Sequence, residues 1–272
     1  MDIIDIGVNL EHNSFDADRK EVIDRAVASG VTTMIVTGSS RQSSIRAQEL
    51  TTEYQGLLYS TAGIHPHHAS DHGPGDHEWI TALAASDSVV AVGECGLDFF
   101  RNFSPRADQE SAFRDQLEIA SQVGLPVFLH QRDAHERFIS ILRDHIPDIA
   151  GGVAHCFTGN RSELEDCLDL GLNIGITGWI CDERRGSHLA NLVKHIPRDR
   201  IMIETDAPYL LPRDLDPKPK TRRNEPMFLA HVLDSVAHHM ECDASELAAD
   251  TTANARRLFG LPGGPHHIPA LH

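Results

Sequence analysis

The chain has 272 residues, of which 40% are hydrophobic and 24% are charged, and both values are ordinary for a globular protein. This composition excludes a largely disordered chain, a collagen-like chain and a disulfide-stabilised miniprotein. The formal charge of −16 excludes the overall positive field of a protein that coats nucleic acid, so any contact with a polyanion has to be local. No apolar run is long enough to span a membrane, and no signal peptide precedes the first apolar run, so we expect a cytoplasmic protein.

Eight short runs of apolar and β-branched residues recur along the chain. They are residues 3–6, 31–36, 57–62, 89–92, 127–129, 152–154, 172–176 and 201–203. Segments with helical periodicity lie between the runs, for example 108–123 and 162–170. Apolar strands that alternate with amphipathic helices are typical of a parallel sheet covered on both faces. Eight such units predict a closed (β/α)8 TIM barrel, and the alternative is an open doubly wound sheet.

No linker divides the chain. We therefore expect a single domain over residues 1–260, followed by a flexible tail over residues 261–272. The loop 211–226 is the richest in proline and basic residues, and it follows the eighth predicted strand. The five cysteines include no C-x-x-C pair, which favours free thiols. The sequence has no long hydrophobic surface stripe, so we expect a monomer.

A histidine or a carboxylate follows five of the eight apolar runs. His65 follows the third run, Glu94 the fourth, His130 the fifth, His155 the sixth and Asp206 the eighth. Because parallel α/β folds build their sites at the carboxyl ends of the strands, these five side chains are expected to meet at one end of the barrel.

Each of these residues also has a structural interpretation. A carboxylate at the end of a buried strand is costly unless it is paired, so Glu94 is either a metal ligand or half of an ion pair. His130 and His155 are either further ligands or buried core histidines. Asp206 is a catalytic base or a ligand, or else it starts the turn that follows it. His65 contacts a substrate phosphate, or it binds a metal together with His67.

Glu94, His130 and His155 form a mixed nitrogen and oxygen donor set, which suits Zn²⁺ or Mn²⁺ and, with water, Mg²⁺. Such an ion would lower the pKa of a bound water, and Asp206 would take its proton. The electrophile stays open between an ester, an amide and a phosphodiester. The basic residues near this end, Arg101, Arg132 and those of the loop 211–226, favour an anionic substrate.

Aromatic and thiol side chains near the same end allow two interpretations. Phe99, Phe103 and Trp179 either stack a nucleobase at the rim or cover the helices. Cys95 and Cys156 adjoin the candidate ligands, but strand alternation predicts that they point to the opposite face and serve as packing residues.

Five motifs together resemble the TatD family of metal-dependent deoxyribonucleases. They are Gly-Ile-His-Pro-His at 63–67, Gly-Glu-Cys-Gly-Leu-Asp at 93–98, Val-Phe-Leu-His-Gln-Arg-Asp-Ala at 127–134, His-Cys-Phe-Thr-Gly at 155–159 and Ile-Glu-Thr-Asp-Ala-Pro-Tyr-Leu at 203–210. The likeness extends from Asp5 to Phe259. Segments 5–10, 176–186 and 211–215 resemble bacterial members of the family in particular.

The resemblance implies a TIM barrel of the metal-dependent hydrolase superfamily. It also implies a 3′→5′ exonuclease that hydrolyses phosphodiester bonds of single-stranded DNA and RNA and is linked to DNA repair. It places the metal ligands at Glu94, His130 and His155, the catalytic carboxylate at Asp206 and a contact with the scissile region at His65. We expect a divalent cation, Mg²⁺ before Mn²⁺ or Zn²⁺.

The chain departs from the wider family at the end of the first strand. Most members carry His-x-His there, whereas this chain has Gly7-Val8-Asn9. We therefore expect one metal site at Glu94, His130 and His155 and a second, weak one. Two other functions stay open: another barrel metallohydrolase acting on an amide, a lactone or an aminoacyl ester, and a binding barrel without catalysis.

Overall fold

The structure is a computed structural model that describes residues 2–263. Eight parallel strands form one sheet in which each strand pairs with the next one along the chain. The strands are β1 (Ile3–Val8), β2 (Val31–Val36), β3 (Leu58–Ala62), β4 (Val89–Asp98), β5 (Val127–Arg132), β6 (Gly152–Ala154), β7 (Asn173–Ile176) and β8 (Ile201–Ile203). Each strand lies on one of the predicted apolar runs, and the TIM-barrel prediction is confirmed.

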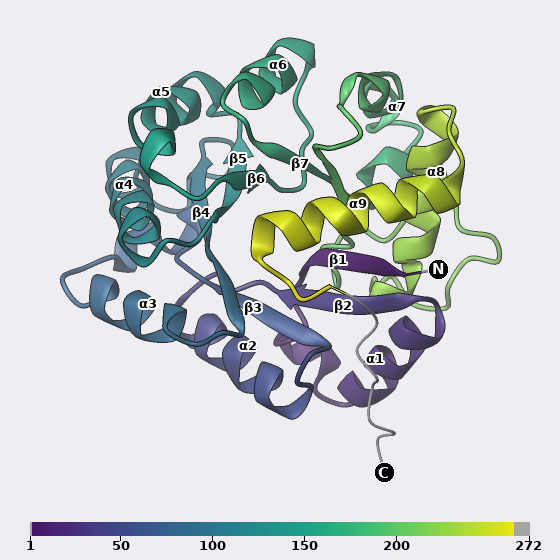
Figure 1. Cartoon of the computed structure of the whole chain (residues 1–272), viewed down its shortest axis with the longest axis horizontal. Coiled ribbons are helices and arrows are strands. Elements are labelled where there is room, and N and C mark those ends of the chain that lie inside the picture. Colours follow the sequence, from purple (N-terminus) through teal and green to yellow (C-terminus); the bar gives the residue numbers. More distant parts are fainter. Residues whose placement is uncertain (1, 264–272) are drawn as a thin grey trace.

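Helices surround the sheet (Figure 1). The α-helices are α1 (Arg19–Ala28), α2 (Arg41–Glu53), α3 (Asp76–Ala84), α4 (Arg106–Val123), α5 (His135–His145), α6 (Arg161–Asp169), α7 (Ser187–Leu192), α8 (Leu229–His239) and α9 (Ala244–Phe259). The 3-10 turns are η1 (Asn13–Phe15), η2 (Pro66–Asp71), η3 (Ile146–Asp148), η4 (Gly178–Cys181), η5 (Val193–His195) and η6 (Pro226–Phe228). The segments predicted as helical, 108–123 and 162–170, correspond to α4 and α6.

The barrel closes between β1 and β8 through polar contacts. The backbone N–H of Asp206 donates to the carbonyl of Gly7 at 2.8 Å, beyond the last residue of β8. The carboxylate of Asp5 accepts hydrogen bonds from the backbone N–H of Thr205 at 2.9 Å and from its hydroxyl. Asp5 is fully buried, and this burial raises its pKa to about 7. A buried polar link therefore joins the first and last strands.

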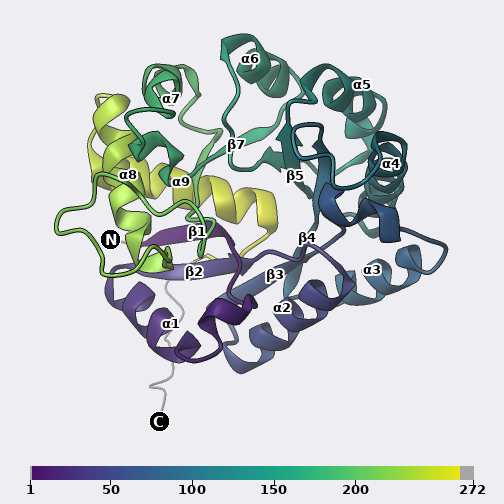
Figure 2. The same ribbon diagram turned by 180° about the vertical axis from the view of Figure 1, so that it is seen from behind.

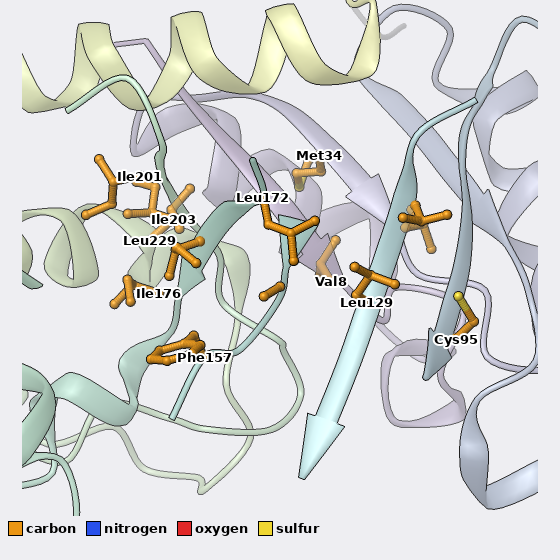
Figure 3. Close-up of a cluster of buried hydrophobic side chains, with 14 of the residues drawn as sticks. Val8, Met34, Cys95, Leu129, Phe157, Leu172, Ile176, Ile201, Ile203 and Leu229 are labelled. Atoms are coloured by element: carbon orange, nitrogen blue, oxygen red, sulfur yellow. The ribbon is translucent and has the colours of Figure 1, made fainter. Parts of the chain in front are cut away.

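Two apolar layers hold the barrel together. The outer layer lies between strands and helices, and Figure 3 shows Val8, Leu129 and Ile203 among its side chains. The inner layer fills the barrel and is completed by the C-terminal helix. Its buried members are Ile4, Ile6, Ile35, Val90, Ala91, Phe128, Val153, Met202, Ala255, Phe259 and Leu261. Helix α9 lies across that end of the barrel in Figure 1, and Figure 2 shows the opposite end, with α9 behind the strands.

Strand β4 is longer than its apolar run predicts. The run ends at Val92, but the strand continues to Asp98, which pairs with Arg132 of β5. A register shift between Gly93 and Cys95 leaves Glu94 as the extra residue of a β-bulge, a feature that often redirects a side chain beside an active site. Glu94 and His130 therefore lie within strands and are held more rigidly than loop residues.

Gly96 permits this extended pairing of β4 with β5. Its φ of +144° is unfavourable for any residue with a side chain. A Cβ atom at Gly96 would lie 1.9 Å from the carbonyl oxygen of His130. A glycine is therefore required where β4 passes the metal-binding candidate on β5.

The described residues end shortly after α9. Leu261 is buried, and its backbone N–H donates to the carbonyl of Arg256 at 3.1 Å. Most of the predicted flexible tail, residues 264–272, lies outside the described residues, so the tail stays a prediction. Within residues 2–263, no helix combines the length and the apolar character that crossing a membrane requires.

Candidate active site

The five predicted site residues lie together at the end of the barrel opposite α9, where they line one cleft. Glu94 is at the centre of the group. Its Oε1 lies 2.7 Å from Nε2 of His155 and 2.9 Å from Nδ1 of His130. Nε2 of His65 lies 3.3 Å from the same oxygen. Three imidazoles from three different strand ends thus converge on one carboxylate oxygen.

This group fits a divalent metal ion. Ligand atoms of His65, Glu94 and His130 all lie within 4.8 Å of one another, and His155 contacts the same carboxylate. Nε2 of His130 is buried and has no hydrogen-bond partner among the described residues, which is costly unless another group binds it. Imidazole and carboxylate donors suit Zn²⁺ and Mn²⁺ and, with water, Mg²⁺.

The hydrogen bonds of the imidazoles distinguish His65 from His155. Nδ1 of His65 accepts the backbone N–H of His67 at 3.0 Å, so the proton of the neutral ring is on Nε2, which faces the cleft. Nδ1 of His155 lies 3.4 Å from Oε2 of Glu204 and its Nε2 lies 2.7 Å from Oε1 of Glu94, so a cation that displaced the Nε2 proton would find the ring held by Glu204. His65 is therefore arranged to donate a hydrogen bond, and His155 is arranged to bind a cation.

The protonation of the cluster favours a cation at its centre. Burial alone would raise the pKa of Glu94, but the neighbouring imidazoles of His65 and His155 hold it well below its usual value. Burial alone would lower the pKa values of His130 and His155, but the surrounding carboxylates raise both. Burial lowers the pKa of His65 to about 4. A cation bound beside Glu94 would therefore compete with protons for the same imidazole nitrogens.

Asp206 lies beside the cluster, just beyond β8. Its φ of +54° is in the left-handed region. Its Oδ1 accepts a hydrogen bond from Nδ2 of Asn9 at 3.1 Å. Burial raises the pKa of Asp206 to about 7, although His155 opposes the shift. A carboxylate with this pKa can accept a proton near neutral pH.

Asn9 follows the last residue of β1, at the position where the resemblance implies a histidine in most relatives. Its side-chain amide donates to Asp206 and, at 3.3 Å, to the carbonyl of Ala207. Asn9 therefore holds the carboxylate of Asp206 in place. The prediction of one tight and one weak metal site stays a prediction.

Glu204 is a site residue that the sequence analysis did not select. It is fully buried, and its Oε1 accepts the backbone N–H of Cys156 while its Oε2 faces Nδ1 of His155. Gly7 leaves room for it, because a Cβ atom there would lie 2.3 Å from Oε2 of Glu204. Glu204 is two residues away from both Met202 and Asp206, which face the inside of the barrel. Because alternate residues of a strand face the same side, this spacing could have identified Glu204.

Asp98 forms a second carboxylate partner of the histidines. Its Oδ2 lies 2.7 Å from Nε2 of His67 and 3.7 Å from Nε2 of His130. Burial alone would raise the pKa of Asp98, but these two imidazoles hold it below its usual value. His67 is therefore occupied by Asp98 and does not contact Glu94.

The cleft above the cluster has a volume of about 820 Å³, an acidic floor and a basic rim. The residues of the rim are Arg101, Phe103, Arg132, Trp179, Arg185, Tyr209 and Arg222. The guanidinium of Arg132 lies 4.6 Å from the ring of Phe100 and 5.8 Å from that of Trp179. Arg185 lies 4.7 Å from the Trp179 ring. Alternating aromatic and cationic groups thus border a cleft of the size of a small ligand.

The structure places two of the three candidate aromatic residues at the cleft and the third elsewhere. Phe103 and Trp179 line the cleft, and the Phe103 side chain is 66% exposed. Phe99 packs against the outer core beneath Arg106, 4.3 Å away, which favours the interpretation that it covers a helix. Cys95 is buried in the outer core as predicted.

Two expectations need correction. Cys156 lines the cleft, because its φ of +44° interrupts the strand alternation that predicted the opposite face. In the basic loop, Arg222 reaches the cleft, whereas Arg213 pairs with Asp182 and Arg223 with Asp18. Two of the five basic residues of this loop are therefore paired within the protein.

Residues 4–260 match the family model described as TatD related DNase. The chain belongs to this family. Two TatD proteins described as 3′-5′ ssDNA/RNA exonucleases are similar over 259 residues, or 95% of this chain. The protein of Klebsiella pneumoniae is 53% identical with 98% of its length covered. That of Erwinia tasmaniensis is 54% identical over its whole length.

Solved structures of TatD proteins have the same fold. The TatD homologue YJJV of Escherichia coli superposes with a TM-score of 0.87 at 29% identity and covers 96% of this chain and 98% of its own. A TatD-family hydrolase of Entamoeba histolytica gives a TM-score of 0.86 at 27% identity, covering 95% and 98%. A lactonase of Listeria monocytogenes, at 13% identity and a TM-score of 0.61, shares the fold alone.

Proposed function

We propose that this TatD-family chain is a divalent-metal-dependent 3′→5′ exonuclease of single-stranded DNA and RNA. The observation that carries the proposal is the convergence of three imidazoles on Glu94 beneath a rim of arginines and aromatic rings. Relatives that are 53–54% identical over nearly the whole chain are described as 3′-5′ ssDNA/RNA exonucleases, which supports the same reaction here.

Glu94, His130 and His155 would hold the ion, for which we propose Mg²⁺, with Mn²⁺ and Zn²⁺ as ions that the same donors accept. A divalent ion held there supplies positive charge to the phosphate and lowers the pKa of a water molecule. Glu204 would hold His155 through Nδ1 and leave Nε2 to the ion once the ion has displaced its proton. Nε2 of His130 makes no hydrogen bond within the described residues, with Oδ2 of Asp98 3.7 Å away, and this supports its assignment as a ligand.

Asp206 would take the proton from the water that attacks phosphorus. Its pKa of about 7 allows it to be a base near neutral pH, and Asn9 fixes the direction of its carboxylate. We assign His65 to the scissile phosphate, because its protonated Nε2 faces the cleft and can donate to a phosphate oxygen. A phosphodiester needs both charge neutralisation and an oriented oxygen nucleophile, and these residues would provide the two functions.

The rim would bind the rest of the strand. Arg101, Arg132 and Arg222 are placed around the cleft to contact phosphates, and Trp179 can stack a base. The bases of a single strand are free to turn towards these rings, and its scissile phosphate can reach the floor. A duplex is too wide and stiff for the same path, so we expect single strands to be preferred.

The assay that tests this function uses a single-stranded oligonucleotide labelled at its 5′ end, with Mg²⁺ and with or without EDTA. We expect a ladder that shortens from the 3′ end and that EDTA abolishes. The Glu94→Ala variant, purified in parallel, controls for contaminating nucleases and should give no ladder. If the oligonucleotide stays intact and the protein hydrolyses a lactone, an amide or an aminoacyl ester in an EDTA-sensitive way, the alternative metallohydrolase function is correct and the nuclease function is not.

Three narrower expectations belong to the same proposal. A monomer is tested by light scattering, and a cytoplasmic location by fractionation of the producing cell. A role in DNA repair is tested by the survival of a deletion strain after oxidative DNA damage, with complementation by the wild-type chain and by the Asp206→Asn variant. Complementation by both proteins would separate the survival phenotype from the nuclease.

A further inference from the structure

A second group of metal-binding side chains lies outside the cleft. Cys181 ends η4, Asp214 lies in the loop between β8 and η6, and His231 lies near the start of α8. The thiol sulfur, a carboxylate oxygen and an imidazole nitrogen all lie within 4.8 Å of one another. Three segments that are separate in the sequence therefore bring sulfur, oxygen and nitrogen donors to one point.

The group has a buried end and an open end. Cys181 is only 4% exposed, whereas the side chains of Asp214 and His231 are 42% and 33% exposed. Nε2 of His231 lies 2.7 Å from Oδ1 of Asp214. Ser235, one turn further along α8, contacts the thiol as well. An ion at this point would have three protein ligands and one position open to water.

The surrounding charges leave Asp214 available. Its neighbour in the sequence, Arg213, pairs instead with Asp182 at 3.1 Å, and Arg185 pairs with the same carboxylate at 3.0 Å. A bound divalent cation deprotonates a coordinating thiol, and its two charges would then balance one thiolate and one carboxylate.

We propose that Cys181, Asp214 and His231 form a zinc site that fastens the loop between β8 and η6 to the barrel. Zn²⁺ accepts cysteine, histidine and aspartate in tetrahedral geometry, and three protein ligands with one water is an established arrangement for this ion. A thiolate ligand disfavours Mg²⁺, so the site differs in its chemistry from the donors around Glu94.

The position of the site gives it a structural consequence. The loop that it would fasten carries Tyr209 and Arg222, which line the cleft. An ion bound outside the cleft would therefore hold one wall of the cleft in place. The proposal does not depend on the nuclease function, because zinc binding can be measured without any substrate.

Equilibrium dialysis of the full chain against micromolar Zn²⁺ tests the proposal. The Glu94→Ala variant is the starting point, because it lacks the central carboxylate of the cleft. We expect this variant to retain one zinc ion per chain, and to lose it when either Cys181→Ser or His231→Gln is added. Cys242→Ser, which removes a half-buried thiol elsewhere, should leave binding unchanged. Absence of zinc from the Glu94→Ala variant, or zinc that survives both added substitutions, would overturn the proposal.

The spectrum of the Co²⁺-loaded chain identifies the thiol. We expect thiolate-to-cobalt charge-transfer absorption in the near ultraviolet that disappears with Cys181→Ser and persists with Cys156→Ser, which removes the thiol of the cleft. A missing band, or a band that depends on Cys156, would contradict the assignment. If circular dichroism shows that Cys181→Ser does not fold, His231→Gln decides, because this partly exposed side chain can be replaced without opening the core.

Discussion

Helix α9 covers one end of the barrel, and there the side chains that point inward from the strands are apolar. Two residues further along several of these strands, the inward side chains are charged or polar. The successive inward residues are Phe128 and His130 on β5, Val153 and His155 from β6, and Met202 and Glu204 from β8. The change takes place within one pleat of each strand, because alternate residues face the same side.

The two ends differ in what they contribute to stability. The apolar end removes hydrocarbon surface from water and is completed by Phe259 of α9. The mouth keeps carboxylates and imidazoles in positions where burial opposes their charge. TIM barrels commonly separate stability and function in this way. Substitutions at the mouth should therefore reduce activity and spare the fold, and substitutions at the covered end should do the reverse.

The largest effect on activity is expected for Asp206→Asn. This substitution keeps the shape of the side chain but removes the proton acceptor, so turnover of a single-stranded oligonucleotide should fall by about 10²–10⁴-fold. Steady-state kinetics with Mg²⁺ provide the measurement, and circular dichroism shows whether the fold is intact. Turnover close to that of the wild type would exclude Asp206 as the base.

The same variant should show the cost of this carboxylate to stability. Burial raises the pKa of Asp206 from 3.8 to about 7, so the folded chain holds this proton more tightly than the unfolded chain does. The stability of the wild type in EDTA should therefore fall relative to Asp206→Asn as the pH rises from about 4 to about 7, and the difference should then stay constant. Urea unfolding at several pH values measures it, and parallel curves would contradict the pKa.

Phe259→Ala tests the opposite end. Phe259 is 4% exposed and packs into the inner core, so its removal should lower the free energy of unfolding by about 3–5 kcal/mol. Turnover by the folded protein at low temperature should be unchanged, because α9 does not reach the cleft. A variant that keeps its stability and loses turnover would contradict the division between the two ends.

The sequence predicted the strands and the five site residues for the same physical reason. A strand buried on both faces has to be continuously apolar, so a histidine or carboxylate directly after it is conspicuous. Glu94, His130 and His155 were visible in this way. The bulge at Glu94 was not, because the apolar run stops at Val92 while pairing with β5 continues to Asp98.

Other features depend on contacts that no local pattern records. Arg223 looks like a free cation in a basic loop, but its partner Asp18 is far away in the sequence. Cys156 faces the cleft because of a left-handed backbone conformation, which an ordinary strand pattern does not anticipate. Glu204 differs from these residues, because its two-residue spacing from Met202 and Asp206 could be read from the sequence.

Glu204→Gln tests whether His155 needs the carboxylate of Glu204 to bind the metal ion. A neutral amide in place of the carboxylate would hold His155 less firmly, so we expect a loss of about 10–100-fold in metal affinity. Added Mg²⁺ should restore much of the activity, which a merely destabilised fold would not allow. Glu183→Gln, on an exposed carboxylate, is the matched control. Activity that is reduced equally at all metal concentrations would remove this positioning role.

The smallest effect is expected at the rim, where the mouth meets solvent. Stacking of a base on an aromatic ring is worth about 1–3 kcal/mol, so Trp179→Ala should raise KM by about 5–150-fold and leave kcat unchanged, because Trp179 lies at the rim beside Arg132 and Arg185. Trp179→Phe keeps a ring and should recover part of the affinity. A dinucleotide offers fewer bases to the rim, and its KM should respond less than that of a long strand. An equal rise in KM for both substrates would show that Trp179 acts near the scissile bond and not on the rest of the strand. The rim would then take part in positioning the reacting phosphate.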